Sequence, residues 1–198
     1  MSSHTDNAGT RFGMWLFLYT ELMLFGGLFV LYAVYYYKYS NDFTSGGAEM
    51  ELFYGTLNTA ILLTSSFCVA ASIEAIKKNS KKLAIVLLYL TCLFGIIFLM
   101  NKYVEWSNKF SHGIYPGSER LAGSAKGVQI FFGLYFTLTG LHALHVLIGT
   151  SLMGTCLFLT EKGKITGSKV IILENSGLYW HLVDIIWIFI FPLFYLIL

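Results

Sequence analysis

Charged residues are scarce in this sequence of 198 residues. They make up 12% of the chain, against about 25% in an ordinary soluble domain, whereas hydrophobic residues make up 56%. There is no basic run or aromatic platform of the kind that binds nucleic acid, and the net charge of +2 is too small to be informative. This composition predicts an integral membrane protein without a large domain outside the membrane.

Cysteine and the common catalytic motifs are scarce as well. Cys68, Cys92 and Cys156 each stand alone in an apolar segment, so we interpret them as small hydrophobic residues rather than disulfide partners or thiolate ligands. The sequence contains no Cys-x-x-Cys pair, no P-loop and no Gly-x-Ser-x-Gly motif, and its five histidines are too few for a haem–copper centre. We therefore expect an accessory or scaffold subunit without a catalytic centre of its own.

Five apolar stretches dominate the sequence. They run approximately over residues 12–37, 52–72, 83–102, 128–160 and 175–198, and each reaches the length of about 20 residues that a spanning helix needs. No linker divides the chain, and the polar first eleven residues lack the basic stretch of a cleaved signal peptide. We predict an all-α integral membrane protein, with residues 1–198 forming a single domain of five transmembrane helices.

The positions of lysine and arginine predict the orientation of these helices. Eight of them fall on one side of the membrane, namely Arg11, Lys77, Lys78, Lys81, Lys82, Lys162, Lys164 and Lys169. Five fall on the other side, namely Lys38, Lys102, Lys109, Arg120 and Lys126. Because cytoplasmic loops carry the excess of positive charge, we expect the N-terminus in the cytoplasm and the C-terminus outside.

A few ionisable residues lie within the apolar stretches, namely Glu21, His142, His145, His181 and Asp184. With a rise of about 1.5 Å per helical residue, all of them fall on the cytoplasmic half of the membrane. Such groups are costly in hydrocarbon and should face a partner. We predict one intramembrane polar cluster, with Glu21 hydrogen-bonded to a histidine of the fourth or fifth helix, and His181 paired with Asp184 as a structural pair or a proton relay.

Other interpretations of these residues stay open at this point. His142, His145 and His181 would be the ligands of a metal ion or haem, or they would form interhelical hydrogen bonds. A proton or ion carrier built around Glu21 is a further alternative, although Pro192 alone is a poor sign of the broken helices that carriers use. Three tryptophans are interpreted as packing or interface residues: Trp15, Trp180 and Trp187.

Four segments follow one another in a characteristic order. They are Gly-Met-Trp-Leu-Phe-Leu-Tyr-Thr-Glu at 13–21, Asn-Thr-Ala-Ile-Leu-Leu-Thr-Ser-Ser at 58–66, Thr-Gly-Leu-His-Ala-Leu-His-Val at 139–146 and Tyr-Trp-His-Leu-Val-Asp-Ile-Ile-Trp at 179–187. Together they resemble subunit III of the haem–copper oxidases, that is, of cytochrome c oxidase and quinol oxidases, in its prokaryotic form with five helices. Ala143 replaces a family glycine, and Asn101 stands for the family glutamine before Glu105 and Trp106.

The resemblance implies a non-catalytic subunit of an aerobic respiratory oxidase, in a bacterial or archaeal cytoplasmic membrane. Such a subunit stabilises the catalytic subunit and supports proton uptake during electron transfer to O2. It binds no metal or cofactor of its own, because haem and copper belong to the catalytic subunit I; other oxidase subunits and membrane lipids are partners, and bound phospholipid is compatible with the family. The alternatives are a subunit associated with nitric oxide reductase, which shares these motifs, or a redox protein using His142, His145 and His181.

Overall fold

The computed structural model describes residues 2–167 and 170–197, with side chains from residue 9 onward. All regular structure in these ranges is helical. The helices are α1 (Ser2–Lys38), α2 (Ser40–Ala48), α3 (Leu52–Lys77), α4 (Lys81–Ser111), α5 (Glu119–Ala122), α6 (Lys126–Glu161) and α7 (Ile171–Tyr195). Five of them, α1, α3, α4, α6 and α7, are long and apolar enough to cross a membrane. The predicted all-α class with five long apolar helices is therefore confirmed.

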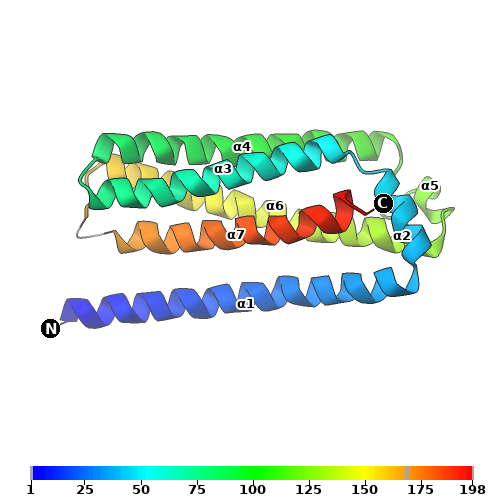
Figure 1. The fold of residues 1–198 in the computed structure, drawn as a ribbon, viewed down its shortest axis with the longest axis horizontal. Helices are drawn as coiled ribbons and strands as arrows, with labels where there is room; N and C mark the ends of the chain where they lie inside the picture. Colours follow the sequence, from blue (N-terminus) through cyan, green and yellow to red (C-terminus); the bar gives the residue numbers. More distant parts are fainter. Residues whose placement is uncertain (1, 168–169, 198) are drawn as a thin grey trace.

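The five long helices run side by side, and the short α2 and α5 lie together at one end (Figure 1). The N-terminus and the α3–α4 turn lie at the opposite end. In that turn Asn79 takes a positive φ of 58°, a conformation that asparagine tolerates better than most residues. Helix α1 extends along the side of α7 (Figure 1) and is the least buried of the five. Few contacts therefore attach α1 to the bundle, and the polar contacts among them are important for its position.

Four helix boundaries differ from the sequence prediction by four residues or more. Helix α1 begins at Ser2 rather than near residue 12, and α3 continues to Lys77 rather than ending near residue 72. Helix α4 continues to Ser111 instead of ending near Lys102. It can do so because Lys102 and Glu105 form an ion pair inside the bundle, so that neither charge is buried without a partner. Helix α7 begins at Ile171, before the predicted start at residue 175. The predicted final residue of this span, Leu198, lies outside the described residues, as does Lys169, which entered the charge count.

The interior is filled by large aromatic side chains, and glycines make room for the largest of them. Trp180 on α7 is fully buried and lies against Gly95 of α4 and Gly149 of α6. A Cβ atom added at Gly95 would lie 2.4 Å from the Thr150 hydroxyl and 3.0 Å from the Trp180 ring, and one added at Gly149 would lie 2.9 Å from that ring. Small residues that allow close helix approach are typical of membrane bundles, and here they allow α4, α6 and α7 to close around one indole.

We expect Gly149→Val to destabilise the bundle by about 1–3 kcal/mol, because the added methyl groups would push Trp180 out of its place. The matched control is Gly154→Val on the same helix, since a Cβ atom there has nothing within 4 Å. The measurement is the thermal unfolding midpoint of each variant in the same detergent. Equal midpoints for the two variants would contradict this description of the packing.

Candidate functional site

Glu21 and His145 form a hydrogen bond inside the apolar region. His145 Nε2 on α6 lies 2.8 Å from Glu21 Oε2 on α1, and the two side chains are 9% and 15% exposed. The Phe25 ring packs at a steep angle to the imidazole, and the Tyr179 ring stacks on it. The predicted bond between Glu21 and a histidine of the fourth or fifth helix is therefore confirmed, and it is a polar tie between α1 and the rest of the bundle.

The second nitrogen of His145 fixes how protons are arranged in this pair. Nδ1 lies 2.7 Å from the backbone carbonyl oxygen of Leu141. A carbonyl oxygen can only accept, so Nδ1 carries a hydrogen. The contact between Nε2 and Glu21 then needs one further proton, held either by the carboxyl group or by the imidazole. In both cases the pair has zero net charge, which is the arrangement that costs least in a hydrocarbon environment.

His181 and Asp184 do not form the direct pair that their spacing suggested. His181 Nδ1 instead lies 2.6 Å from the Ser66 hydroxyl on α3. Asp184 lies close enough to Ser66 for an electrostatic interaction, but neither of its carboxyl oxygens forms a hydrogen bond, although the residue is only 3% exposed. The prediction of a direct His181–Asp184 bond was wrong, because His181 bonds to Ser66 on the neighbouring helix and the Asp184 carboxyl oxygens form no hydrogen bond.

His142 is separated from the other histidines. It is fully buried, and its ring packs against Phe98 and Trp187. Neither ring nitrogen has a hydrogen-bond partner. His142 faces α4 and α7 whereas His145 also reaches α1, because three residues fall short of a full helical turn of 3.6 residues and leave the two side chains about 60° apart around the helix. The residues that we expected to form one cluster therefore occupy three places: the Glu21–His145 pair, the Ser66 region, and the core around His142.

This separation bears on the alternative in which the histidines are ligands. His145 uses Nε2 on Glu21, His181 uses Nδ1 on Ser66, and His142 lies among aromatic rings. Among the described residues, no group of three or more histidine, cysteine, aspartate or glutamate side chains is arranged to hold a metal ion. The structure thus does not assemble the set of His142, His145 and His181 that this alternative needs.

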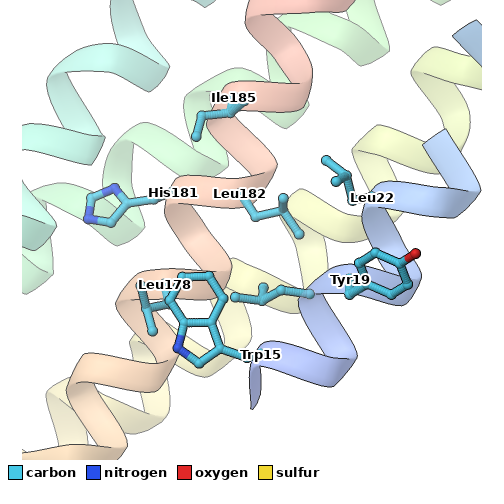
Figure 2. A pocket seen from close by; sticks show the side chains of 8 residues that line it. Trp15, Tyr19, Leu22, Leu178, His181, Leu182 and Ile185 are labelled. Atoms are coloured by element: carbon cyan, nitrogen blue, oxygen red, sulfur yellow. The ribbon is translucent and has the colours of Figure 1, made fainter. Parts of the chain in front are cut away.

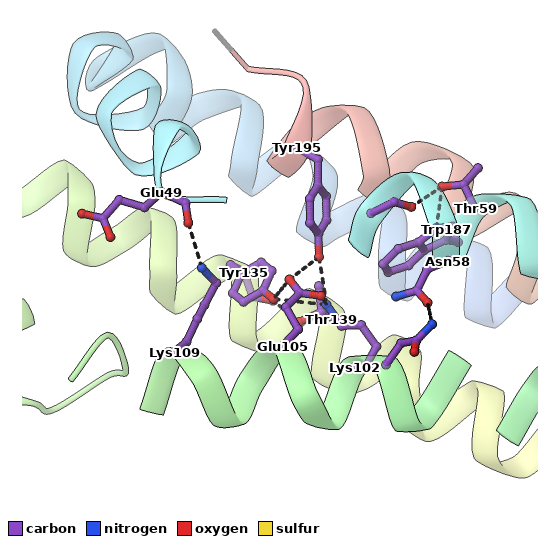
Figure 3. Close-up of polar contacts among 12 residues, drawn as sticks. Glu49, Asn58, Thr59, Lys102, Glu105, Lys109, Tyr135, Thr139, Trp187 and Tyr195 are labelled. Carbon is purple, nitrogen blue, oxygen red and sulfur yellow. Dashed lines mark hydrogen bonds and ion pairs between the residues drawn. The ribbon is translucent and has the colours of Figure 1, made fainter. Parts of the chain in front are cut away.

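A second polar cluster lies toward the other end of the bundle, and sequence reasoning did not find it. Lys102 Nζ on α4 lies 2.9 Å from Glu105 Oε2 and donates to the hydroxyls of Tyr135 on α6 and Tyr195 on α7, at 3.1 and 2.9 Å (Figure 3). Both tyrosine hydroxyls donate to Glu105 Oε1, at 2.5 and 2.6 Å. Lys102 and Glu105 are almost completely buried, so this network joins three helices with its charges neutralised.

The signal for this cluster was present in the sequence. Lys102 and Glu105 are three residues apart and of opposite charge, a spacing at which side chains on a helix meet. It was overlooked because the helix was expected to end at Lys102, which was then counted as a loop lysine. Asn101, which we had aligned with the family position next to Glu105, instead donates to Asn58 on α3 at 3.0 Å. On α4 it is Lys102, and not Asn101, that bonds to Glu105.

The three tryptophans that we had singled out have different environments. Trp180 donates its indole N–H to Ser65 and Trp187 donates to Thr59, both at 3.0 Å, so each buried ring also ties α7 to α3. Trp15 is 61% exposed on α1. Its ring lies beside Leu178 at the wall of an apolar groove between α1 and α7 (Figure 2).

That groove joins a more polar cavity. The apolar part has a volume of about 330 Å³ and is lined chiefly by leucines and aromatic rings of α1 and α7. The polar part, of about 530 Å³, lies nearer the N-terminal end and includes Arg11, Glu74, Lys77 and Glu174. Trp15, Leu178 and His181 line both. Figure 2 shows the His181 ring and Leu182 on opposite sides of α7.

The fold and these contacts define a class. The chain is a multi-pass helical membrane protein whose buried ionisable groups include the Glu21–His145 pair between helices and the Lys102–Glu105 pair within α4. A family model described as cytochrome c oxidase subunit III matches residues 2–197. The chain belongs to this family, subunit III of the haem–copper oxidases.

Individual relatives come from two kinds of oxidase. The chain is 31% identical to the cytochrome bo(3) ubiquinol oxidase subunit 3 of Pseudomonas aeruginosa, over 98% of this chain and 88% of the relative. It is 30% identical to the cytochrome c oxidase subunit 3 of Thermostichus vulcanus, over 93% of this chain and 86% of the relative. A mammalian relative, from Dugong dugon, is 29% identical, with 70% of its length covered. The similarity therefore covers nearly the whole chain.

We expect Glu21→Gln to leave the yield of the folded chain unchanged, because an amide can donate a hydrogen bond to His145 Nε2 as a neutral acid does. Glu21→Leu should lower the yield, since it leaves Nε2 without a partner and costs about 0.6–2 kcal/mol. The measurement is the amount of each variant recovered as a single species by size-exclusion chromatography. Loss of the Glu21→Gln variant would contradict the assigned role of this bond.

Lys102→Met alone should destabilise the bundle by about 3–5 kcal/mol, because it leaves the buried Glu105 carboxylate without a cation. The double variant Lys102→Met/Glu105→Met should recover most of this loss, since a buried pair replaced by apolar residues is often neutral. Lys78→Ala, which breaks the exposed pair with Glu74, is the control and should cost about 0–1 kcal/mol. Denaturation in mixed micelles measures all three; a double variant no better than the single one would refute the network.

Proposed function

We propose that this chain is the non-catalytic subunit III of an aerobic respiratory oxidase, which stabilises the catalytic subunit and supports proton uptake during electron transfer to O2. The observation that carries the proposal is the match of the family model to residues 2–197. The polar groups of the chain support it as well. Glu21 bonds to His145, and Lys102 bonds to Glu105. Such pairs are expected of residues that stabilise a helix bundle.

Under this proposal, haem and copper are bound by the catalytic subunit, and other oxidase subunits complete the complex. Several relatives are bacterial, which supports a bacterial or archaeal cytoplasmic membrane as the location. The names of those relatives include both a cytochrome c oxidase and a ubiquinol oxidase. Either electron donor is therefore compatible with the family.

We further propose that residues 1–198 form one transmembrane domain with the N-terminus in the cytoplasm. Two of the five positive residues counted on the outer side, Lys102 and Lys109, are buried on α4 rather than in a loop. The excess of positive charge at the N-terminal end is thus larger than the sequence count indicated, and the positive-inside rule favours this orientation more strongly. The Glu21–His145 pair and the Ser66 region then lie nearer the cytoplasm than Lys102 does.

We propose that the groove between α1 and α7 binds a phospholipid. Its apolar part, of about 330 Å³ and lined by apolar side chains, has the size and character to take part of an acyl chain. Its polar end holds Arg11 and Lys77, which are paired with Glu174 at 2.9 and 2.8 Å. The formal charges there balance once Glu74 is counted. A zwitterionic headgroup suits such an environment better than an anionic one.

The test is a mild-detergent purification of the tagged chain from its native membranes, followed by a visible absorption spectrum and mass spectrometry of the partners. We expect haem–copper subunits to co-purify, and the haem signal to disappear when they are stripped from this chain. Haem or metal that stays with the stripped chain, and is lost in His142→Ala, would overturn the proposal in favour of a redox protein. Co-purification with nitric oxide reductase subunits would select the related alternative.

A further inference from the structure

The polar cavity at the N-terminal end of the bundle leads toward a buried acid. Its wall carries charged residues of three helices: Arg11 of α1, Glu74 and Lys77 of α3, and Glu174 of α7. Arg11 and Lys77 are both partly exposed, at 60% and 46% of their side chains. With a volume of about 530 Å³, this cavity is large and polar enough to hold water.

His181 stands between this cavity and the interior. Its ring lines the cavity and is only partly buried, and Nδ1 lies 2.6 Å from the Ser66 hydroxyl. Nε2 has no hydrogen-bond partner among the described residues. One ring nitrogen is thus engaged inside the protein, and the other is left for water in the cavity.

Asp184 is more deeply buried than Ser66. It is 3% exposed and neither of its carboxyl oxygens has a hydrogen-bond partner, while Ser66 is the side chain that interacts with it. A carboxyl group without a partner in the membrane interior is expensive to keep, and the contacts within this chain do not repay that cost. The same Ser66 hydroxyl thus lies next to both His181 and Asp184.

We propose that His181, Ser66 and Asp184 form a proton-uptake path, in which Asp184 is an internal site that accepts protons from water in the polar cavity. This assignment rests on the proposed function, because the oxidase would use the proton that the path takes up. The path itself is a property of this chain and can be tested independently of any partner.

The transfer balances with no co-reactant other than water. A hydronium ion in the cavity gives a proton to His181 Nε2 and leaves water. The Nδ1–H bond of the resulting imidazolium then breaks as its proton passes to Ser66 Oγ, while the Ser66 O–H bond breaks and its proton passes to an Asp184 carboxylate oxygen. The products are a neutral imidazole with hydrogen on Nε2, an intact serine and a neutral carboxylic acid. Rotation of the ring, or return of the proton, resets the path.

Charged and titratable groups lie on the helices that surround this path. Helix α1 contributes Arg11 and Glu21, α3 contributes Glu74 and Lys77, α6 contributes His145, and α7 contributes Glu174. The pairs of Glu174 with Arg11 and Lys77, and of Glu21 with His145, neutralise most of this charge locally. They leave Asp184 as the acid of this region that has no cation or hydrogen-bond donor bonded to it.

The test is infrared spectroscopy of the complex purified through this chain, recorded after transfer from H2O to D2O. We expect a carbonyl band of a protonated carboxylic acid that is absent in Asp184→Asn. It should shift quickly in the wild type and roughly a hundredfold more slowly in Ser66→Ala, because a positioned group that transfers protons contributes at least that much. Ser66→Thr keeps the hydroxyl and should exchange like the wild type.

The matched control is Ser72→Ala on the same helix, since the buried Ser72 hydroxyl bonds to the Val69 carbonyl of its own helix and not to His181 or Asp184. Its band should exchange at the wild-type rate. The absence of any band that depends on Asp184, or equal exchange rates in Ser66→Ala and Ser72→Ala, would overturn the path. Purified material without haem–copper subunits would instead count against the proposed function, while the exchange rates would still decide on the path.

Discussion

The constraint on which this structure depends is that hydrocarbon offers no partner to a polar side chain. Each polar group on the five long helices must therefore find a partner within the protein, on its own helix or on another, because an unpartnered group is costly in hydrocarbon. The Glu21–His145 bond ties α1 to α6, and the network around Lys102 ties α4 to α6 and α7. The indole N–H groups of Trp180 and Trp187 tie α7 to α3. Apolar packing alone would not specify these neighbours, because lipid chains offer similar contacts.

The same constraint explains why a protein of a respiratory oxidase family carries so few reactive groups. The histidines that could be ligands are engaged elsewhere: His145 with Glu21 and His181 with Ser66. Most of the polar chemistry of the chain serves to hold its helices in place. Asp184 differs, since it is a buried acid whose carboxyl oxygens form no hydrogen bond although Ser66 and, through it, His181 lie nearby, and it is there that a role beyond packing has the strongest physical case.

The five helices and the Glu21 bond could be predicted from the sequence. The other polar contacts were missed for identifiable physical reasons. The helices were predictable because an apolar run of this length in a membrane can form little other than a spanning helix. The Glu21 bond was predictable because histidines were the available partners at the depth of Glu21 in the membrane. The Lys102–Glu105 pair was missed because charged residues near the end of an apolar run look like the start of a loop. The link between His181 and Ser66 could not be predicted, since one serine among many acquires its role only through the rotation of α3 against α7.

The most direct test of the central claim is a cryo-electron microscopy map of the complex purified through this chain, at a resolution that shows side chains. Our account predicts haem and copper density only within a larger partner subunit, with Glu21 bonded to His145 and Lys102 to Glu105 in this chain. Density for a haem or a metal ion held by His142, His145 or His181 would contradict it.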